Sequence, residues 1–310
     1  MLSAAYPYRT AGDGNARGRS PHGRNRSVDR ALNLLVLVSG AKRPLRFSEL
    51  QRQTGVPKGS LHALVRSLLE AGFLQSSAQG MSIGFTAFEV GTSIPLVRSA
   101  RSIVDPALDE LTAVTRESSH FGTLVEGDVL YLNRRAASYD LLSISRVGHR
   151  KRAYGTALGK AMLSCLDDDE IAAIYPEQLP PLTENTIRTR EELMTELAWC
   201  RRRGFASECE ESTPGVRCIG MAISVGGTIF GLSLTAPVLR VDGTQLEQMQ
   251  PVLAAAVERV DKAMRVSSWL GELEIEFAAE GAGSCFARRG GSRGPGTGTS
   301  KARRRDGEGP

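Results

Sequence analysis

The most constraining feature of the sequence is the succession of short amphipathic segments and glycines in residues 26–86. Ser27 is placed to cap a first helix, and Ser48, with a glutamine three residues later, to open a second helix that ends at Gly55. A third apolar stripe at helical spacing ends at Gly72, and two short strand-like segments follow it. Helix, helix, glycine turn, helix and hairpin is the order of a winged helix-turn-helix, and we predict that fold here.

Beyond residue 86 the pattern changes to strands alternating with helices. The stretch 87–103, interrupted by Pro95, predicts a linker helix, and another helix is expected to start at Asp105-Pro106. The expected strands are 120–125, 129–133, 141–147, 219–225 and 229–235, and the expected helices are 156–166, 167–175, 189–203 and one long helix after Asp242. The predicted class is α+β, an N-terminal winged helix-turn-helix plus a C-terminal α/β sensor domain, a GAF/PAS-like antiparallel sheet with helices.

Charge is distributed unevenly along the chain. Residues 1–25 carry a net charge of +3, residues 26–90 of +4 and residues 286–310 of +5, whereas the total is only +5, so residues 91–285 are net −7. Because residues 1–25 and 281–310 contain almost nothing apolar, we expect 1–25 and 269–310 to be largely disordered basic tails. A compact basic segment before an acidic body is the arrangement expected if only the first domain meets a polyanion.

The sequence contains no recognisable catalytic or metal-binding constellation. The four histidines are scattered, and the five cysteines lack the spacing of a zinc site. The sequence has no run of about 18 apolar residues and no secretory signal. We therefore expect no enzymatic activity, no catalytic residue, no metal, no cofactor, no membrane association and a cytoplasmic location.

Seven short stretches, in the same order along the chain, resemble the IclR family of bacterial regulators. They are Ser27–Leu32, Thr54–Lys58, Leu158–Ala161, Leu182–Ile187, Arg203–Ala206, Glu210–Ile219 and Ser233–Pro237. The resemblance implies a homodimer or dimer of dimers that reads double-stranded DNA through residues 26–86. It also implies that residues 104–268 form an effector-binding and oligomerisation domain, whose ligand is a small organic acid.

In a helix-turn-helix the second helix lies in the major groove and its exposed side chains contact bases and phosphates. Lys58, Ser60 and His62 can bond to either, whereas Arg66 is better placed for the backbone. The candidate DNA-contacting residues are Arg30, Lys58, Gly59, Ser60, His62, Arg66 and Gln79, of which Arg30 is assigned by resemblance and Gln79 by its place in the wing. Half-sites mirror the symmetry of a dimer, so we predict a pseudo-palindromic operator.

The candidate effector site lies in the second domain. By resemblance, its residues are Ala157, Leu158, Glu208, Cys218, Ser233 and Thr235. Ser233 and Thr235 share a face of one strand, which fits a pocket and equally fits an ordinary half-polar sheet face. Lys151 and Arg152 lie just upstream of the helix at 156–166, either in a solvated loop or facing the ligand. If they face inward, they favour a carboxylate or dianion over a neutral sugar.

Together these features predict a sequence-specific transcription regulator that controls a catabolic operon in response to a small organic acid. The alternative is a protein-interaction or ligand-sensing module with only non-specific DNA affinity. Specific operator binding by the purified protein would distinguish the first hypothesis from the second.

Overall fold

The computed structural model describes residues 25–93, 95–137 and 145–269. The chain divides into two compact units that meet between Gly91 and Thr92, and each is described by itself. Among the described residues, none of the helices is long and apolar enough to cross a membrane.

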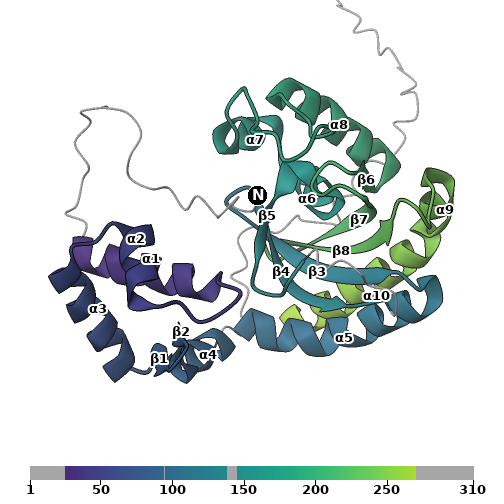
Figure 1. Ribbon diagram of the computed structural model, residues 1–310. Helices are drawn as coiled ribbons and strands as arrows, with labels where there is room; N and C mark the ends of the chain where they lie inside the picture. The colour runs from purple at the N-terminus through teal and green to yellow at the C-terminus, as the bar shows by residue number, and fades with distance from the viewer. Residues whose placement is uncertain (1–24, 94, 138–144, 270–310) are drawn as a thin grey trace, which may run out of the picture. The chain divides into compact units, whose positions relative to one another are not determined.

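The N-terminal unit is a winged helix-turn-helix, as predicted (Figure 1). Leu34, Leu50 and Leu61 come from its first three helices and are buried together in one core. The loop before the second helix is tied to the wing by reciprocal backbone hydrogen bonds between Leu45 and Met81, of 2.9 and 2.8 Å. The elements are α1 (Arg26–Ser39), α2 (Phe47–Thr54), α3 (Lys58–Glu70), β1 (Leu74–Ser77), β2 (Gly80–Ile83) and α4 (Phe85–Thr92).

The starts of the first two helices differ from the predicted ones. Asn25, not Ser27, caps α1, because its side-chain oxygen accepts from the backbone N–H groups of Ser27 and Val28 at 3.1 and 3.4 Å. Helix α2 begins one residue before Ser48. Glu49 Oε2 accepts a hydrogen bond of 2.9 Å from the backbone N–H of Arg46, the residue before the helix. Gly55 ends α2, as predicted, in the left-handed conformation with a φ of 64°.

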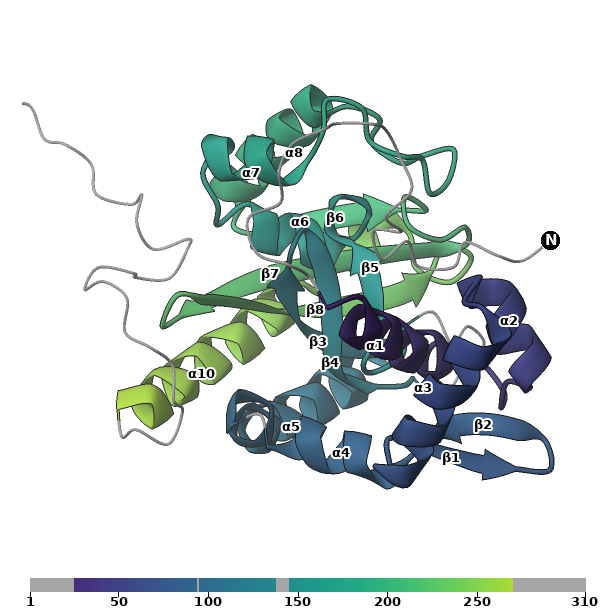
Figure 2. The same ribbon diagram turned by 90° about the vertical axis from the view of Figure 1, so that its left-hand side faces the viewer.

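The C-terminal unit is an antiparallel sheet of six strands in the order β5-β4-β3-β8-β7-β6. Helices α5 and α10 cover one face, and α6, α7 and α8 lie over the other (Figures 1 and 2). This arrangement is the predicted α+β class with an antiparallel sensor sheet. The elements are α5 (Pro95–Thr115), β3 (Ser118–Val125), β4 (Asp128–Arg135), β5 (Arg150–Arg152), a 3-10 turn (Ala153–Gly155), α6 (Ala157–Leu163), α7 (Asp168–Ile174), α8 (Arg190–Arg203), β6 (Ala206–Cys209), β7 (Val216–Val225), β8 (Thr228–Pro237), α9 (Gly243–Gln248) and α10 (Gln250–Trp269).

Two prolines act differently from the predictions. Instead of a linker helix at 87–103 and a new helix at Asp105-Pro106, α4 ends at Thr92 and α5 continues through Pro106 to Thr115. Pro106 is exposed on α5, so its ring leaves the buried face of that helix intact. The long helix expected after Asp242 is broken into α9 and α10, because Pro251 has no N–H to continue the α9 hydrogen-bond ladder.

The sheet also has two edge strands, β5 and β6, that were not predicted. Both are short, at three and four residues. The strand predicted at 141–147 lies partly outside the described residues, and 145–149 form a turn that leads into β5.

Helix α6 lies almost directly on the sheet because three glycines lie beneath it. Gly122, Gly220 and Gly231 come from β3, β7 and β8, and we call them the glycine platform. A Cβ atom at Gly220 would be 2.8 Å from backbone atoms of Ala157 and Leu158, and one at Gly231 would be 2.6 Å from Leu158 Cδ1. The platform therefore brings the first turn of α6 against the strands.

Candidate nucleic-acid interface and ligand site

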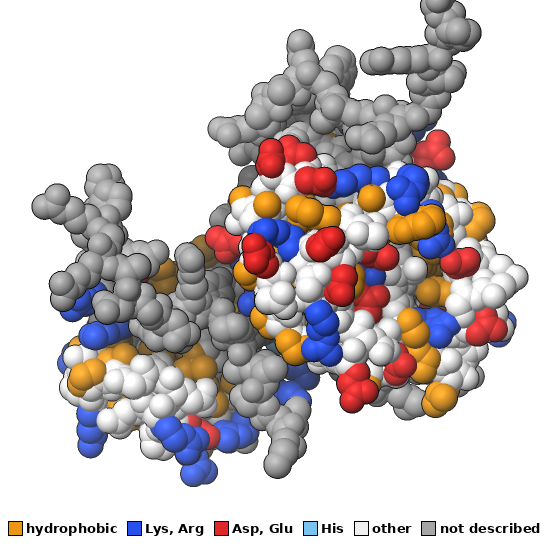
Figure 3. All heavy atoms as spheres, turned by 90° about the horizontal axis from the view of Figure 1, so that it is seen from above, with side chains coloured by type: hydrophobic (Ala, Val, Ile, Leu, Met, Phe, Trp, Pro, Cys, Tyr) orange, Lys and Arg blue, Asp and Glu red, His pale blue; other side chains and the backbone are white. Residues whose placement is uncertain are grey.

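The outer face of α3 carries the predicted DNA-contacting side chains. Leu61 and Val65 are buried and Leu64 is partly buried against the same core, whereas His62 and Ala63 are exposed, as the helical period requires. Lys58, Gly59, Ser60, His62 and Arg66 are all exposed on this helix, so the structure brings five of the seven candidates together. The space-filling view shows several Lys and Arg side chains along the edge of the visible part of this unit (Figure 3).

Two side chains on this face have contacts that the sequence did not indicate. The His62 ring stacks on Phe47 of α2, with centroids 4.0 Å apart and planes 19° apart, so the ring orientation is held. Arg66 pairs with Glu70 one turn later at 2.7 Å, an exposed pair that costs little to exchange for a phosphate.

The remaining two DNA candidates lie on other elements. Arg30 is exposed on α1, and Gln79 is exposed in the β1–β2 turn, where its backbone N–H donates to Ser77 Oγ at 3.2 Å. Their placement fits a backbone contact and a wing contact, respectively.

The predicted effector residues gather on the sheet face beneath α6. Glu208, Cys218 and Thr235 lie on adjacent strands as successive pairing partners, and Cys218 Sγ is 3.2 Å from Thr235 Oγ1. Ser233 lies two residues along the same strand and pairs with Gly220. Since Gly220 touches the first turn of α6, Ala157 and Leu158 adjoin the same surface.

Three further polar residues belong to this surface and were not predicted as members of the site. His120 Nδ1 on β3 is 3.5 Å from Thr235 Oγ1, and its ring meets the edge of the Tyr131 ring at a centroid distance of 5.7 Å. Lys151, left open by the sequence, lies on β5, half-buried, and its Nζ donates to Thr213 Oγ1 at 3.1 Å. Only the strand pairing places them here: His120 meets Thr235, 115 residues later, through the pairing of β3 with β8, and Lys151 is placed by the pairing of β4 with β5.

Burial dominates the electrostatics of this surface. It lowers the pKa of His120 to about 3, with help from Arg134 and Lys151, so the imidazole is neutral at physiological pH. Burial also raises the pKa of the Glu208 carboxyl and of the Cys218 thiol and lowers the pKa of Lys151. The neutral His120 ring and the protonated Cys218 thiol lie near the half-buried ammonium of Lys151. Such a surface is suited to binding a polar ligand and not to nucleophilic chemistry, which needs a thiolate.

The buried His120 predicts a pH-dependent stability. An unfolded histidine binds a proton below pH 6.5, whereas the folded one does so only near pH 3, so the free energy of unfolding falls as pH decreases between these values. We expect His120→Gln to remove about 2 kcal/mol of the loss between pH 7 and pH 5. Urea unfolding at both pH values measures it, and equal pH dependence in both proteins would contradict the assignment.

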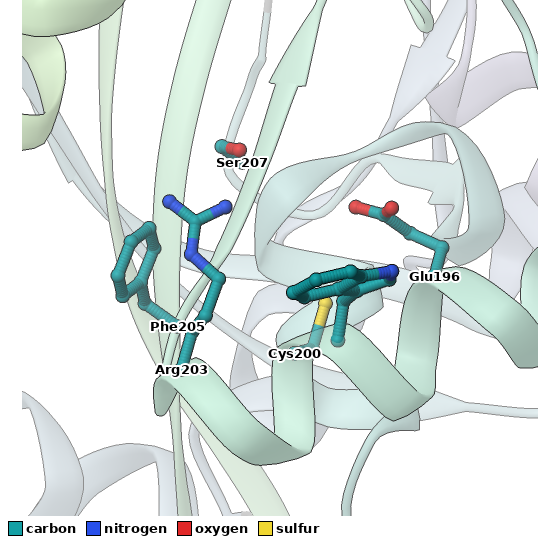
Figure 4. Close-up of a pocket in the computed structure, with 6 residues that line it drawn as sticks. Glu196, Cys200, Arg203, Phe205 and Ser207 are labelled. Atoms are coloured by element: carbon teal, nitrogen blue, oxygen red, sulfur yellow. The ribbon is translucent and has the colours of Figure 1, made fainter.

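A cavity of about 310 Å³ lies elsewhere, between α8 and the edge strand β6 (Figure 4). Its lining residues are Glu196, Trp199, Cys200, Arg203, Phe205 and Ser207, none of which is a predicted effector residue. Arg203 is already paired with Glu247 at 2.6 Å and stacked on Phe205 at 4.2 Å. The buried polar groups of the sheet lie beneath α6 and not around this cavity.

Two family models match the chain. The IclR helix-turn-helix domain matches residues 27–78, and the model described as bacterial transcriptional regulator IclR, C-terminal, matches residues 94–262.

Curated relatives match over most of their own length. The chain is 29% identical over 249 residues to the HTH-type transcriptional regulator KdgR of Escherichia coli strain K12, a match that covers 77% of this chain and 93% of that protein. It is 28% identical over 243 residues to the regulator XynR of the same organism, covering 77% and 96%. It is 27% identical over 239 residues to the Pca regulon regulatory protein of Pseudomonas putida, covering 74% and 81%.

Solved structures share the fold. An IclR homolog complexed with 4-hydroxybenzoate, from Microbacterium hydrocarbonoxydans, matches with a TM-score of 0.70 and 19% identity over 78% of this chain and all of that one. The IclR of Thermotoga maritima matches with a TM-score of 0.62 and 22% identity, over 77% and 98% of the two chains. Both likenesses concern the architecture of the two units.

Proposed function

The chain belongs to the IclR family of bacterial transcriptional regulators, with a helix-turn-helix for DNA and a C-terminal ligand-binding domain, and from this we propose that it controls a catabolic operon by binding a pseudo-palindromic operator. The observation that carries the proposal is the exposed polar face of α3 within a basic unit. The named relatives are regulators rather than enzymes. In this proposal the protein acts in the cytoplasm as a homodimer or dimer of dimers.

Within this proposal, the roles of the seven DNA candidates differ. His62, whose ring is held by Phe47, would read a base edge together with Lys58 and Ser60. Arg66 and Arg30 would contact phosphates, Gln79 would contact DNA from the wing, and Gly59 would let the backbone approach closely.

The proposed effector is a small organic acid bound beneath α6 by Ala157, Leu158, Glu208, Cys218, Ser233 and Thr235. The support is the buried polar character of this sheet face and its neutral His120. The structural neighbour from Microbacterium hydrocarbonoxydans is itself complexed with an acid, 4-hydroxybenzoate.

The test is a titration of the purified protein against DNA flanking its own gene, at two salt concentrations and with excess random DNA. We expect His62→Ala to weaken operator binding by about 1–3 kcal/mol while leaving random DNA binding nearly unchanged. We expect Arg66→Ala to weaken both and to reduce the salt slope by about 1.

The control is Arg202→Ala, which removes a cation stacked on Trp199 in the sensor unit and should change neither. Equal affinity for operator and random DNA would contradict the proposal. That result would leave a ligand-sensing module with non-specific DNA affinity.

A further inference from the structure

Lys151 is a half-buried cation without an acidic partner. Its ammonium donates to Thr213 Oγ1, and no carboxylate oxygen of the described residues lies within 4 Å of it. The charged groups that act on it are farther away, with the Glu208 carboxyl among them. Removing a charge from water without a counter-charge is costly, so this position calls for an anion.

Two neighbouring cations in the same unit, unlike Lys151, each form an ion pair with a carboxylate. Lys160, also buried, has Glu211 at 2.8 Å and Glu196 at 3.4 Å. Arg152, next to Lys151 on β5, pairs with Asp128 at 3.2 Å. Because side chains alternate along a strand, Lys151 alone of this pair points to the sheet face beneath α6.

Glu208, at the opposite edge of the sheet, has a buried acceptor atom that needs a hydrogen-bond donor. The residue is 4% exposed, and its Oε2 accepts from the backbone N–H of Glu211 at 2.9 Å. Its Oε1 is fully buried and forms no well-aligned hydrogen bond within the described residues, although the Cys218 thiol lies close enough to affect the pKa of this carboxyl. A buried carboxylate oxygen in this state requires a donor.

The two groups lie on one surface, although β5 and β6 are the outermost strands. The contact between Lys151 on β5 and Thr213, in the loop after β6, closes this surface across the sheet. Resting on the proposed function, we propose that the effector is a hydroxy acid. Its carboxylate pairs with Lys151 Nζ, and its hydroxyl donates to Glu208 Oε1.

Other ligand classes leave one of the two groups unsatisfied. A neutral polyol gives Glu208 its donor but leaves Lys151 without a counter-charge. A simple carboxylic acid neutralises Lys151 but gives Glu208 Oε1 nothing. Leaving one of these buried groups without a partner costs enough free energy to lower the affinity about tenfold or more. The protein therefore selects ligands that carry both a carboxylate and a hydroxyl.

The first experiment measures binding of two matched sets to the full chain by calorimetry. The sets are glycerate, propionate and glycerol, and 4-hydroxybenzoate, benzoate and phenol. We expect at least one of the two hydroxy acids to bind about tenfold or more tightly than both of its partial analogues. Equal or tighter binding of a partial analogue contradicts the proposal, and so does failure of both hydroxy acids to bind at 10 mM.

The second experiment is Lys151→Met, with Arg152→Met as the matched control. We expect Lys151→Met to weaken binding of the preferred hydroxy acid about tenfold or more while leaving the ligand-free protein as stable as before or more so, because it removes an uncompensated charge. A merely structural lysine would instead lower the melting temperature. We expect Arg152→Met to keep the preference for the hydroxy acid, and loss of that preference only in this control would overturn the role given to Lys151.

Operator binding measured on the same preparations separates the two proposals. Retained operator binding without a hydroxy-acid preference contradicts only the ligand class. Loss of specific operator binding in the unsubstituted protein contradicts the proposed function itself.

Discussion

Replacing Lys160 with methionine is expected to lower the free energy of unfolding of the sensor unit by about 3–5 kcal/mol. Lys160 is 1% exposed within α6, and its ammonium binds Glu211 of the β6–β7 loop and Glu196 of α8. Burial opposes its charge, but the two carboxylates outweigh burial and raise the pKa of Lys160. Methionine fills the space and leaves the Glu211 carboxyl buried without its cation.

Urea unfolding monitored by circular dichroism gives this change in the free energy of unfolding, and scanning calorimetry gives an independent value. The control is Arg259→Met, which breaks an equally short pair with Glu110 whose side chains are 51% and 53% exposed, and which should cost about 0–1 kcal/mol. Equal losses in the two variants would show that burial of the Lys160 pair has no special weight.

Replacing Gly220 with valine is expected to abolish the response to ligand while sparing the DNA-binding unit. The new Cβ would lie 2.8 Å from the backbone of Ala157 and Leu158, so α6 must move away from the strands that carry Cys218. Overpacking of this kind costs about 1–3 kcal/mol or more, and it separates the two halves of the proposed ligand site.

The measurement is ligand-dependent operator binding beside a calorimetric scan of both units. Gly91→Ala in α4 is the matched control, because no atom lies within 4 Å of its new Cβ, and it should stabilise that helix by about 0.5–1 kcal/mol while leaving the ligand response unchanged. An intact ligand response in the valine variant would show that α6 need not rest on the glycine platform.

Local rules accounted for much of the fold. Thr189 and Asp167, the first residues of two predicted helices, cap α8 and α7, and such caps can be found from sequence because a capping side chain and the backbone N–H it accepts from are three residues apart. Asn25 was overlooked in favour of Ser27 because both can cap, and only the observed helix start distinguishes them. The helix start predicted at Pro106 was wrong. A proline usually marks the first turn of a helix, but burial of the apolar face of α5 stabilises this helix by more than the missing hydrogen bond costs.

The proposed ligand site was less predictable, because it depends on which strands pair. The face shared by Ser233 and Thr235 follows from the period of a strand. The addition of His120 follows from the pairing of β3 with β8, which no local pattern specifies. Lys151 was ambiguous because three residues are too few to show strand alternation, so β5 looked like a loop.

The same pairing has a consequence for how the chain is made. Thr123 on β3 bonds to the backbone of Ile229 on β8, 106 residues later, so the central strand pair of the sheet cannot form until β8 has left the ribosome. The N-terminal unit, complete by residue 91, has by then been available to fold for a time on the order of ten seconds at ordinary rates of translation. Each new chain therefore passes through an interval in which a DNA reader exists before the sensor that would govern it.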